Sequence, residues 1–223
     1  MNDYKSTVLQ TKKALDLKDN SVLNNTSDIF LLEDALDGIK AAINYGFTAE
    51  GIIAINKSFV HSEKEDPKFP GHLRTSKFYN PEDKIVVITD PNGTTKNAYY
   101  APDDVFIEDI ENIINAFNAS NKTNNDAWRV FARIAKLQPF QDGNKRTALI
   151  AANAAKNTWS NQDYLVLPFN NQNHSDFMIN LMKYYNASND KEENMLLDNM
   201  FDLIPTPEQI QLYLSHLEDS SKT

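Results

Sequence analysis

A short stretch near the middle of the chain, residues 138–149, carries the residue types best suited to chemistry. It reads QPFQDGNKRTAL and places the carboxylate of Asp142 just before a Gly-Asn turn and two cations, Lys145 and Arg146. The small apolar run that follows predicts a helix, and the unpaired backbone N–H groups at a helix start attract anions. Arg offers a planar fork of donors to a phosphate, and Mg²⁺ prefers one or two carboxylates together with phosphate oxygens. The stretch therefore predicts a nucleotide phosphate site with a bound Mg²⁺.

The same residues also fit an ordinary junction between a loop and a helix, with solvated charges. In that case Asp142 only stabilises the positive end of the helix, by about 0.3–1 kcal/mol. Gly143 and Asn144 would then form a plain turn, and Arg146 would pair with a carboxylate such as Asp142. Asn153, seven residues after Arg146 and on the same helix face, also has two roles open to it. It could contact a nucleotide or satisfy a backbone carbonyl as a buried amide.

The longer string resembles the signature of the Fic family, H-P-F-x-D/E-G-N-G/K-R-T. The matching positions are Pro139, Phe140, Asp142, Gly143, Asn144, Lys145, Arg146 and Thr147. Apolar residues at helical spacing over 127–137 make the motif a loop between two helices, as in that family. Upstream, PGHLR at 70–74 and YYAP at 99–102 resemble the segments that flank the family's substrate-binding flap. The resemblance spans residues 30–185 or thereabouts.

The resemblance implies a mainly α fold, a Fic-type helical bundle with one β-hairpin flap, and ATP and Mg²⁺ as cofactors. The positions that it assigns to the nucleotide phosphates are Gly143, Asn144, Lys145, Arg146 and Thr147, with the metal at Asp142. An unidentified protein target would add a strand to the flap. The flap positions that it assigns to this target are Val87, Ala98, Tyr99 and Tyr100. The implied activity is that of a protein adenylyltransferase, a nucleotidyltransferase that moves AMP to a protein hydroxyl (AMPylation).

Three positions depart from the AMP-transferring members. Gln138 stands where the family's motif has a His, the general base that takes the proton of the target hydroxyl. A carboxamide does not titrate near neutral pH, and loss of a positioned base costs about 10²–10⁴-fold in rate. Leu149 replaces a second phosphate-binding Arg, and Lys145 replaces a Gly. The GNKRTAL ending resembles the toxin–antitoxin-like branch of death-on-curing toxins, whose members resemble protein kinases in activity.

Three explanations of Gln138 stay open at this point. The chain is a slow enzyme for AMP or phosphoryl transfer, since positioning and charge stabilisation supply much of the catalysis in phosphate transfer. Alternatively, it is a catalytically dead pseudoenzyme that binds nucleotide or a protein partner and regulates an active relative. An engineered His→Gln replacement is the third explanation. The nearby titratable candidates for a substitute base are His72 and Arg74.

Composition narrows the class of protein. The 223 residues contain no Cys, which excludes disulfides and thiolate metal sites, and the four His show no metal-ligand spacing. A net charge of −9 argues against nucleic acid as a partner, because phosphate-backbone binding draws on clustered Lys and Arg. No long apolar run or N-terminal signal core is evident, so we expect no membrane association and a cytoplasmic location.

Apolar periodicity predicts the elements that position the motif. Helices are expected over 4–17, 29–45, 105–118, 127–137, 177–185 and 207–217, together with one capped by Thr48 and one from the motif to about 159. Two β-branched and aromatic runs, 84–89 and 97–100, flank a DPNG turn and predict the hairpin. We expect an N-terminal helical extension over 1–27, a Fic-type domain over 28–204, and a C-terminal helix and tail over 205–223.

Overall fold

The structure is a computed structural model that describes residues 26–61, 69–75, 86–88, 98–161 and 163–220. The helix expected over 4–17 lies outside these residues. Most of the described chain is helical, which confirms the expected mainly α class. Within the described ranges, none of the helices combines the length and apolar character that a membrane crossing needs.

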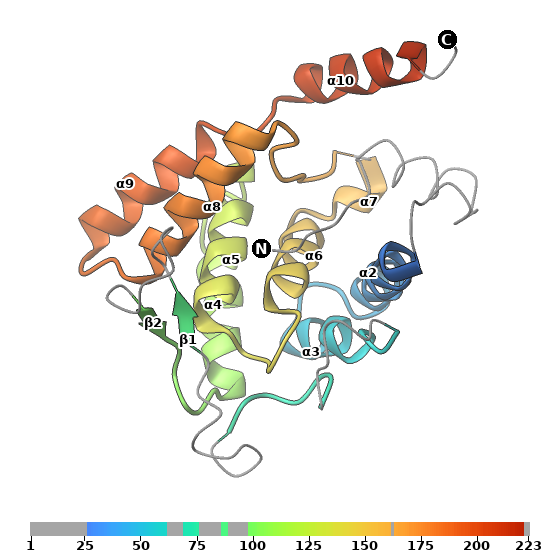
Figure 1. Cartoon of the computed structure of the whole chain (residues 1–223). Coiled ribbons are helices and arrows are strands. Elements are labelled where there is room, and N and C mark those ends of the chain that lie inside the picture. The colour runs from blue at the N-terminus through green and yellow to red at the C-terminus, as the bar shows by residue number, and fades with distance from the viewer. Residues whose placement is uncertain (1–25, 62–68, 76–85, 89–97, 162, 221–223) are drawn as a thin grey trace.

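Two central helices, α5 (Asn124–Leu137) and α6 (Asn144–Lys156), lie side by side, and the motif loop joins them (Figure 1). α5 begins at Asn124 because Thr123 and Asp126 cap its first turn reciprocally. Its apolar face is rich in large side chains, whereas α6 presents alanines, of which Ala148, Ala151 and Ala152 are fully buried. Small residues let the two helix backbones approach closely, so the loop between them is firmly held at both ends.

Two helix pairs flank this centre (Figure 1). On the α6 side lie α2 (Thr26–Tyr45) and α3 (Ala49–Lys57), and Thr48 caps α3 as the sequence predicts. On the α5 side lie α8 (Asn171–Tyr185) and α9 (Asp190–Phe201), while α4 (Ile107–Asn118) packs on α5 and α3. The short α7 (Thr158–Asn161) follows α6, and α10 (Pro207–Ser220) extends away from the bundle at the top of Figure 1.

The core is continuous from α2 to α9 and centres on α5. The rings of Trp128, Phe131 and Phe177 pack together with centroids 5.4–5.9 Å apart, which ties α8 to α5. α8 and α9 begin earlier than their apolar residues suggest. Asn170 and Asn189 cap them with side-chain oxygens, and polar first turns hide such starts from a search for apolar periodicity.

The hairpin is present as predicted, as the antiparallel pair β1 (Val86–Ile88) and β2 (Ala98–Tyr100). Val86 pairs with Tyr100, Val87 with Tyr99 and Ile88 with Ala98. The rest of the expected runs 84–89 and 97–100, together with the DPNG turn, lies outside the described residues. The hairpin sits beside the end of α5 that leads into the motif loop (Figure 1).

Candidate active site

The motif loop reverses the chain with left-handed backbone at both ends. Gln138, the residue after α5, has φ 50° and ψ 56°, and Gly143, the residue before α6, has φ 72° and ψ 8°. A Cβ atom at Gly143 would lie 2.7 Å from the Cδ2 atom of Phe59 and 3.1 Å from the Nδ2 atom of Asn56. Both the backbone conformation and the close packing therefore require glycine at position 143.

Asn144 holds the loop together from inside. Its Oδ1 atom accepts from the backbone N–H of Phe140 at 2.8 Å, and its Nδ2 atom donates to the carbonyl of Phe140 at 2.8 Å. The same Nδ2 atom lies 3.1 Å from the Oε1 atom of Gln138. Phe140 itself is fully buried in the core, as its apolar side chain predicts. The Asn144 side chain therefore shapes the loop, and only its backbone is left to face an anion.

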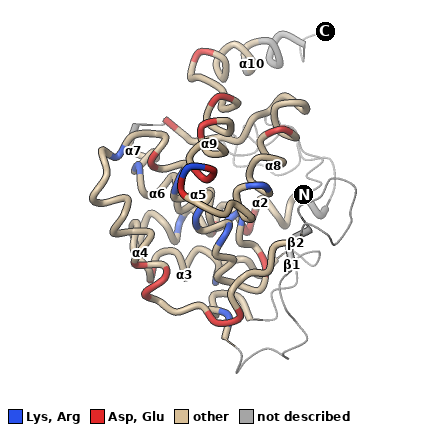
Figure 2. Tube along the Cα trace, turned by 90° about the vertical axis from the view of Figure 1, so that its left-hand side faces the viewer, with Lys and Arg blue, Asp and Glu red and all other residues tan. Residues whose placement is uncertain are grey.

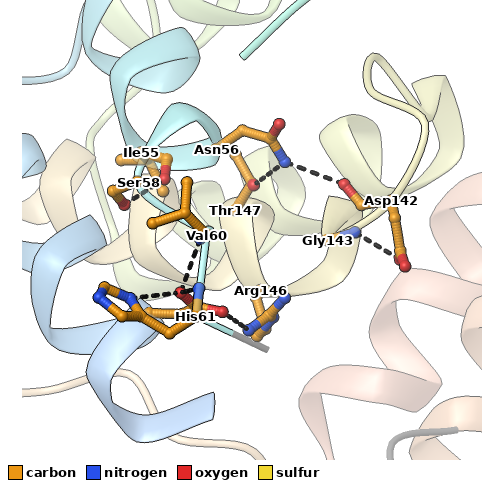
Figure 3. A network of polar contacts seen from close by, with 10 residues as sticks. Ile55, Asn56, Ser58, Val60, His61, Asp142, Gly143, Arg146 and Thr147 are labelled. Carbon is orange, nitrogen blue, oxygen red and sulfur yellow. Dashed lines mark hydrogen bonds and ion pairs between the residues drawn. The ribbon is translucent and has the colours of Figure 1, made fainter. Parts of the chain in front are cut away.

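Asn56 of α3 fixes the loop from the other side (Figure 3). Its Nδ2 atom donates to the carbonyl of Asp142 at 2.9 Å and to the hydroxyl of Thr147 at 3.3 Å. Its Oδ1 atom accepts from the backbone N–H of Gly71 at 2.8 Å. Thr147 is fully buried, so its hydroxyl faces Asn56 and not the surface. Sequence reasoning missed Asn56, because one Asn on a helix carries no signal of its distant partners.

Arg146 points toward α2 and the chain after α3 (Figure 3). Its Nη1 atom lies 3.5 Å from Oδ2 of Asp34, and its guanidinium carbon lies 4.3 Å from the centre of the Phe59 ring. The other oxygen of Asp34 accepts from the backbone N–H groups of Val60 and His61 at 2.8 and 2.9 Å. The carboxylate partner is therefore Asp34, and not Asp142 as the sequence suggested for the alternative to phosphate.

Asp142 and Lys145 are both partly exposed at the start of α6. Oδ1 of Asp142 accepts from the backbone N–H of Gly143 at 2.6 Å, and no side chain caps the helix at Gly143. Among the described residues, no group of three His, Cys, Asp or Glu side chains could hold a metal ion. The single carboxylate of Asp142 thus suits a metal shared with phosphate oxygens, which is the coordination that Mg²⁺ prefers.

Positive charge gathers around the start of α6. Lys145 and Arg146 are adjacent there, in a chain whose net charge is −9. Figure 2 shows Lys and Arg positions around α5 and α6, with acidic positions on α9 and ahead of α4. Clustered positive charge of this kind attracts an anion.

Gln138 is 7% exposed and uses both ends of its side chain within the protein. Its Nε2 atom donates to the carbonyl of Ala135 at 2.5 Å, and its Oε1 atom accepts from Asn144. Nearby, Leu149, which stands where the resemblance would place a second Arg, packs against the core. The loop therefore offers neither a proton acceptor at position 138 nor a cation at position 149.

The two residues considered as substitutes for the base, His72 and Arg74, lie in the segment ahead of the hairpin. His72 is exposed, and its Nδ1 atom lies 3.3 Å from the carbonyl of Pro70 in its own segment. Arg74 is 5% exposed, and its Nε atom donates to the carbonyl of Gln138 at 2.6 Å. Arg74 is therefore a donor that caps the end of α5. It takes no proton, since a guanidinium stays charged throughout the accessible pH range.

Tyrosines around the end of α5 also stay protonated at neutral pH. Burial raises the pKa of Tyr99 above its usual value, although the positive charge of Arg74 opposes this. Burial, with the nearby charge of Glu193, raises the pKa of Tyr184 to about 12. The pKa of Tyr185 is raised as well, mainly by burial. None of these phenols can act as a general base near pH 7.

The sequence left two roles open for Asn153, contact with a nucleotide or hydrogen bonding to backbone as a buried amide, and the structure shows the second. Its Nδ2 atom donates to the carbonyls of Leu149 and Leu165 at 2.9 and 3.1 Å. Its Oδ1 atom accepts from the hydroxyl of Thr158 and the backbone N–H of Leu165 at 2.8 and 2.9 Å. The side chain thereby ties the chain after α7 to α6.

The two flap tyrosines face opposite ways. The hydroxyl of Tyr99 donates to the carbonyl of Lys136 at 2.9 Å, and its ring lies 5.3 Å from the ring of Tyr185. Tyr100 is 64% exposed. Of the positions assigned to a target, Val87 and Ala98 form ladder pairs with Tyr99 and Ile88. Tyr99 thus contacts the protein's own helix, and Tyr100 is the tyrosine that an incoming segment can reach.

This combination, a left-handed glycine before an uncapped helix start and a loop held by Phe140 and an Asn, agrees with a recognised family. Residues 46–155 match the family model described as Fic/DOC family. This part of the chain is a Fic/DOC domain. No curated protein sequence is significantly similar to the chain.

Solved structures show the same fold. A segment of Fic-1 from C. elegans is 15% identical, with a TM-score of 0.55 over 98% of this chain and 60% of that chain. A single-substitution variant of that segment is 14% identical, with a TM-score of 0.50 over 97% of this chain and 61% of that chain. The chain therefore spans about three fifths of the Fic-1 segment that it matches. At this identity the likeness concerns the fold of the Fic/DOC domain and its surroundings.

Proposed function

We propose that the Fic/DOC domain binds ATP with Mg²⁺ at the start of α6 and transfers AMP very slowly or not at all. The observation that carries nucleotide binding is the uncapped start of α6, which follows a left-handed Gly143 and the carboxylate of Asp142. Backbone N–H groups at such a start, with the positive end of the helix dipole, favour phosphate. The loop is held on both sides by Asn56 and Asn144, so it is organised before any ligand arrives.

Different residues of the loop and of the α6 start have different proposed roles in binding. The backbone N–H groups at the start of α6 and the side chain of Lys145 hold the phosphates, and Asp142 holds the metal together with phosphate oxygens. A metal at this position neutralises charge on the phosphates. Arg146 adds positive charge nearby while its guanidinium stays against Phe59 and Asp34. The buried Thr147 supports the loop through Asn56.

The Gln at position 138 is the reason for proposing a low activity. A target hydroxyl must give up a proton when it attacks a phosphate, and Gln138 has no site that accepts one at neutral pH. Its amide is also already committed to Ala135 and Asn144, which leaves little capacity to orient a hydroxyl. This commitment favours a second candidate function, that of a regulatory protein that binds nucleotide and a partner without catalysis.

A protein partner is proposed to bind along the hairpin. Exposed Tyr100 provides an amphipathic contact beside a short strand, and β-addition uses such hairpins. Proline at Ala98 would remove a backbone donor and weaken partner capture while ATP affinity is kept. A parallel fall in ATP affinity would mean that the hairpin only supports the fold.

Calorimetry with ATP, with and without Mg²⁺, tests the nucleotide site. Lys145→Met should weaken ATP binding about tenfold, the effect of losing one charge-assisted contact. Lys156→Met is the matched control, since Lys156 lies at the other end of α6 and donates to the carbonyl of Lys122. Asp142→Asn should abolish the gain that Mg²⁺ gives. Absence of ATP binding to the unaltered chain would overturn the proposal.

Labelled ATP tests the reaction. The chain and its Gln138→His variant are each incubated with a cell extract and with ATP labelled at either the α or the γ phosphate. Label from α in protein reports AMP transfer, label from γ reports phosphorylation as in death-on-curing relatives, and label from neither reports a non-catalytic protein. A robust α signal from the unaltered chain would refute the assignment of slow transfer.

A further inference from the structure

The end of α5 is capped by side chains from three separate parts of the chain. The last carbonyl groups of a helix have no partners within it, so they need donors from elsewhere. The side chain of Gln138 donates to the carbonyl of Ala135, and the hydroxyl of Tyr99 in the flap donates to the carbonyl of Lys136. Arg74 donates to the carbonyl of Gln138 at 2.6 Å and to that of Leu137 at 3.5 Å. One helix end thus joins the motif to the flap.

Arg74 also anchors both ends of the segment that contains the flap. Its backbone N–H donates to the carbonyl of Pro139 at 2.9 Å, and its own carbonyl accepts from the N–H of Val105 at 2.8 Å. Both strands of the hairpin lie between Arg74 and Val105 in the sequence. The guanidinium is nearly fully buried at the negative end of α5, where a cation is stabilised. Arg74 therefore connects the segments before and after the hairpin to each other and to the backbone of the motif loop.

Tyr99 fastens the middle of the hairpin. It lies in β2 and pairs with Val87 of β1, so its position sets the position of both strands. The ring packs 5.3 Å from the ring of Tyr185, and the hydroxyl reaches the carbonyl of Lys136. Because burial raises the pKa of Tyr99, its hydroxyl remains a donor at neutral pH. The neighbouring Tyr100 is exposed and makes a matched comparison.

We infer that Tyr99 and Arg74 are positioning residues, which lock the hairpin to backbone 136–139 and thereby set its distance from position 138 and from the start of α6. A segment laid along the hairpin would reach the loop in one register, set by this lock. The functional part of this inference rests on the proposed function, in which the nucleotide binds at the loop. The lock itself is a property of the ligand-free protein.

Hydrogen exchange on the full chain tests the lock without any ligand. Tyr99→Phe keeps the ring and removes the hydroxyl, and Tyr100→Phe removes a hydroxyl of the same kind from the exposed face. Amides of Val86–Ile88 and Ala98–Tyr100 should exchange about two- to tenfold faster in Tyr99→Phe than in Tyr100→Phe, the ratio that one hydrogen bond gives. Amides in the middle of α6 should be unchanged in both variants. Equal exchange in the two variants would overturn the lock.

A second measurement separates positioning from general support. Addition of ATP and Mg²⁺ should slow exchange in the hairpin of the unaltered chain, because the loop and hairpin share the α5 end. In Tyr99→Phe and in Arg74→Lys this slowing should be lost while ATP affinity stays within about threefold, less than the loss of one average hydrogen bond. ATP that binds without any effect on the hairpin of the unaltered chain would contradict the inference. If ATP does not bind at all, the proposed function fails, and the ligand-free comparison still decides on the lock.

Discussion

Arg146 is expected to stabilise the fold through Asp34 more than it contributes to phosphate binding. Arg146→Met keeps an unbranched stem against Phe59 and removes the charge. The side chains of Asp34 and Arg146 are 1% and 9% exposed, so the change removes a cation from beside a buried carboxylate. Breaking a buried pair in this way typically costs about 3–5 kcal/mol. Asp34 keeps two backbone donors and lies 3.1 Å from Nδ1 of His61, so we expect the lower end, about 3 kcal/mol.

Urea unfolding of four proteins measures this pair: the unaltered chain, Arg146→Met, Asp34→Asn, and the double variant. The two single losses should exceed the double loss by about 2 kcal/mol, as for side chains in direct contact. Lys40→Met is the matched control, because Lys40 pairs with Asp37 on the surface of the same helix as Asp34, with exposed fractions of 71% and 37%. It should cost less than about 1 kcal/mol.

Two results would refute this reasoning. One is a loss in Arg146→Met no larger than that in Lys40→Met, with additive energies in the double variant. The other is a more than tenfold loss of ATP affinity in Arg146→Met at unchanged stability, which would identify Arg146 as a direct phosphate ligand.

Three further predictions concern single positions. Gly143→Ala should destabilise the fold by about 2–4 kcal/mol in urea unfolding, because left-handed backbone and a 2.7 Å approach to Phe59 both oppose a Cβ atom; a loss below 1 kcal/mol would contradict the packing described. Gln138→His should raise transfer from labelled ATP by about 10²–10⁴-fold, since it restores a base at the start of the loop; no gain would point to another defect. Because burial raises the pKa of Tyr184 to about 12, the unfolded chain ionises first as pH rises above 10, and stability should fall by about 2 kcal/mol between pH 10 and 12 from this group. Tyr184→Phe should flatten this fall in alkaline melts, and Tyr100→Phe should leave it as it is.

The helices and the hairpin were largely predictable because their signals are local. Thr48 before a run of isoleucines, and the apolar face of α5, give both the type and the start of a helix. The helix expected from 177 begins at Asn171, and the start of α9 was not expected. In both cases the first turn, after Asn170 and Asn189, is polar and shows no apolar periodicity. The domain boundaries expected at 27 and 204 stay predictions.

The motif residues of the site were predictable from the sequence, but their contact partners elsewhere in the chain were not. Gly143 and Phe140 behave as their types suggest, one as a turn that no side chain fits and the other as a core anchor. Two partners of the motif are distant from it in the sequence. Asn56 lies 86 and 91 residues before its partners Asp142 and Thr147, and Asp34 lies farther still from Arg146. Only the packing of α2 and α3 on α6 brings them to the loop.

The Asp34–Arg146 pair crosses the edge of the stretch that matches the Fic/DOC family model, which begins at residue 46. A fragment cut at that edge would keep every motif residue and still lose the contact of Arg146 with Asp34. At the other edge, residue 155, the cut would remove Phe177 and uncover Trp128 and the aromatic cluster around it. The residues that match the family model and the residues whose contacts stabilise the fold thus have different boundaries in this chain. We therefore expect a fragment that folds by itself to need α2 and α8 as well as the stretch by which the chain is recognised.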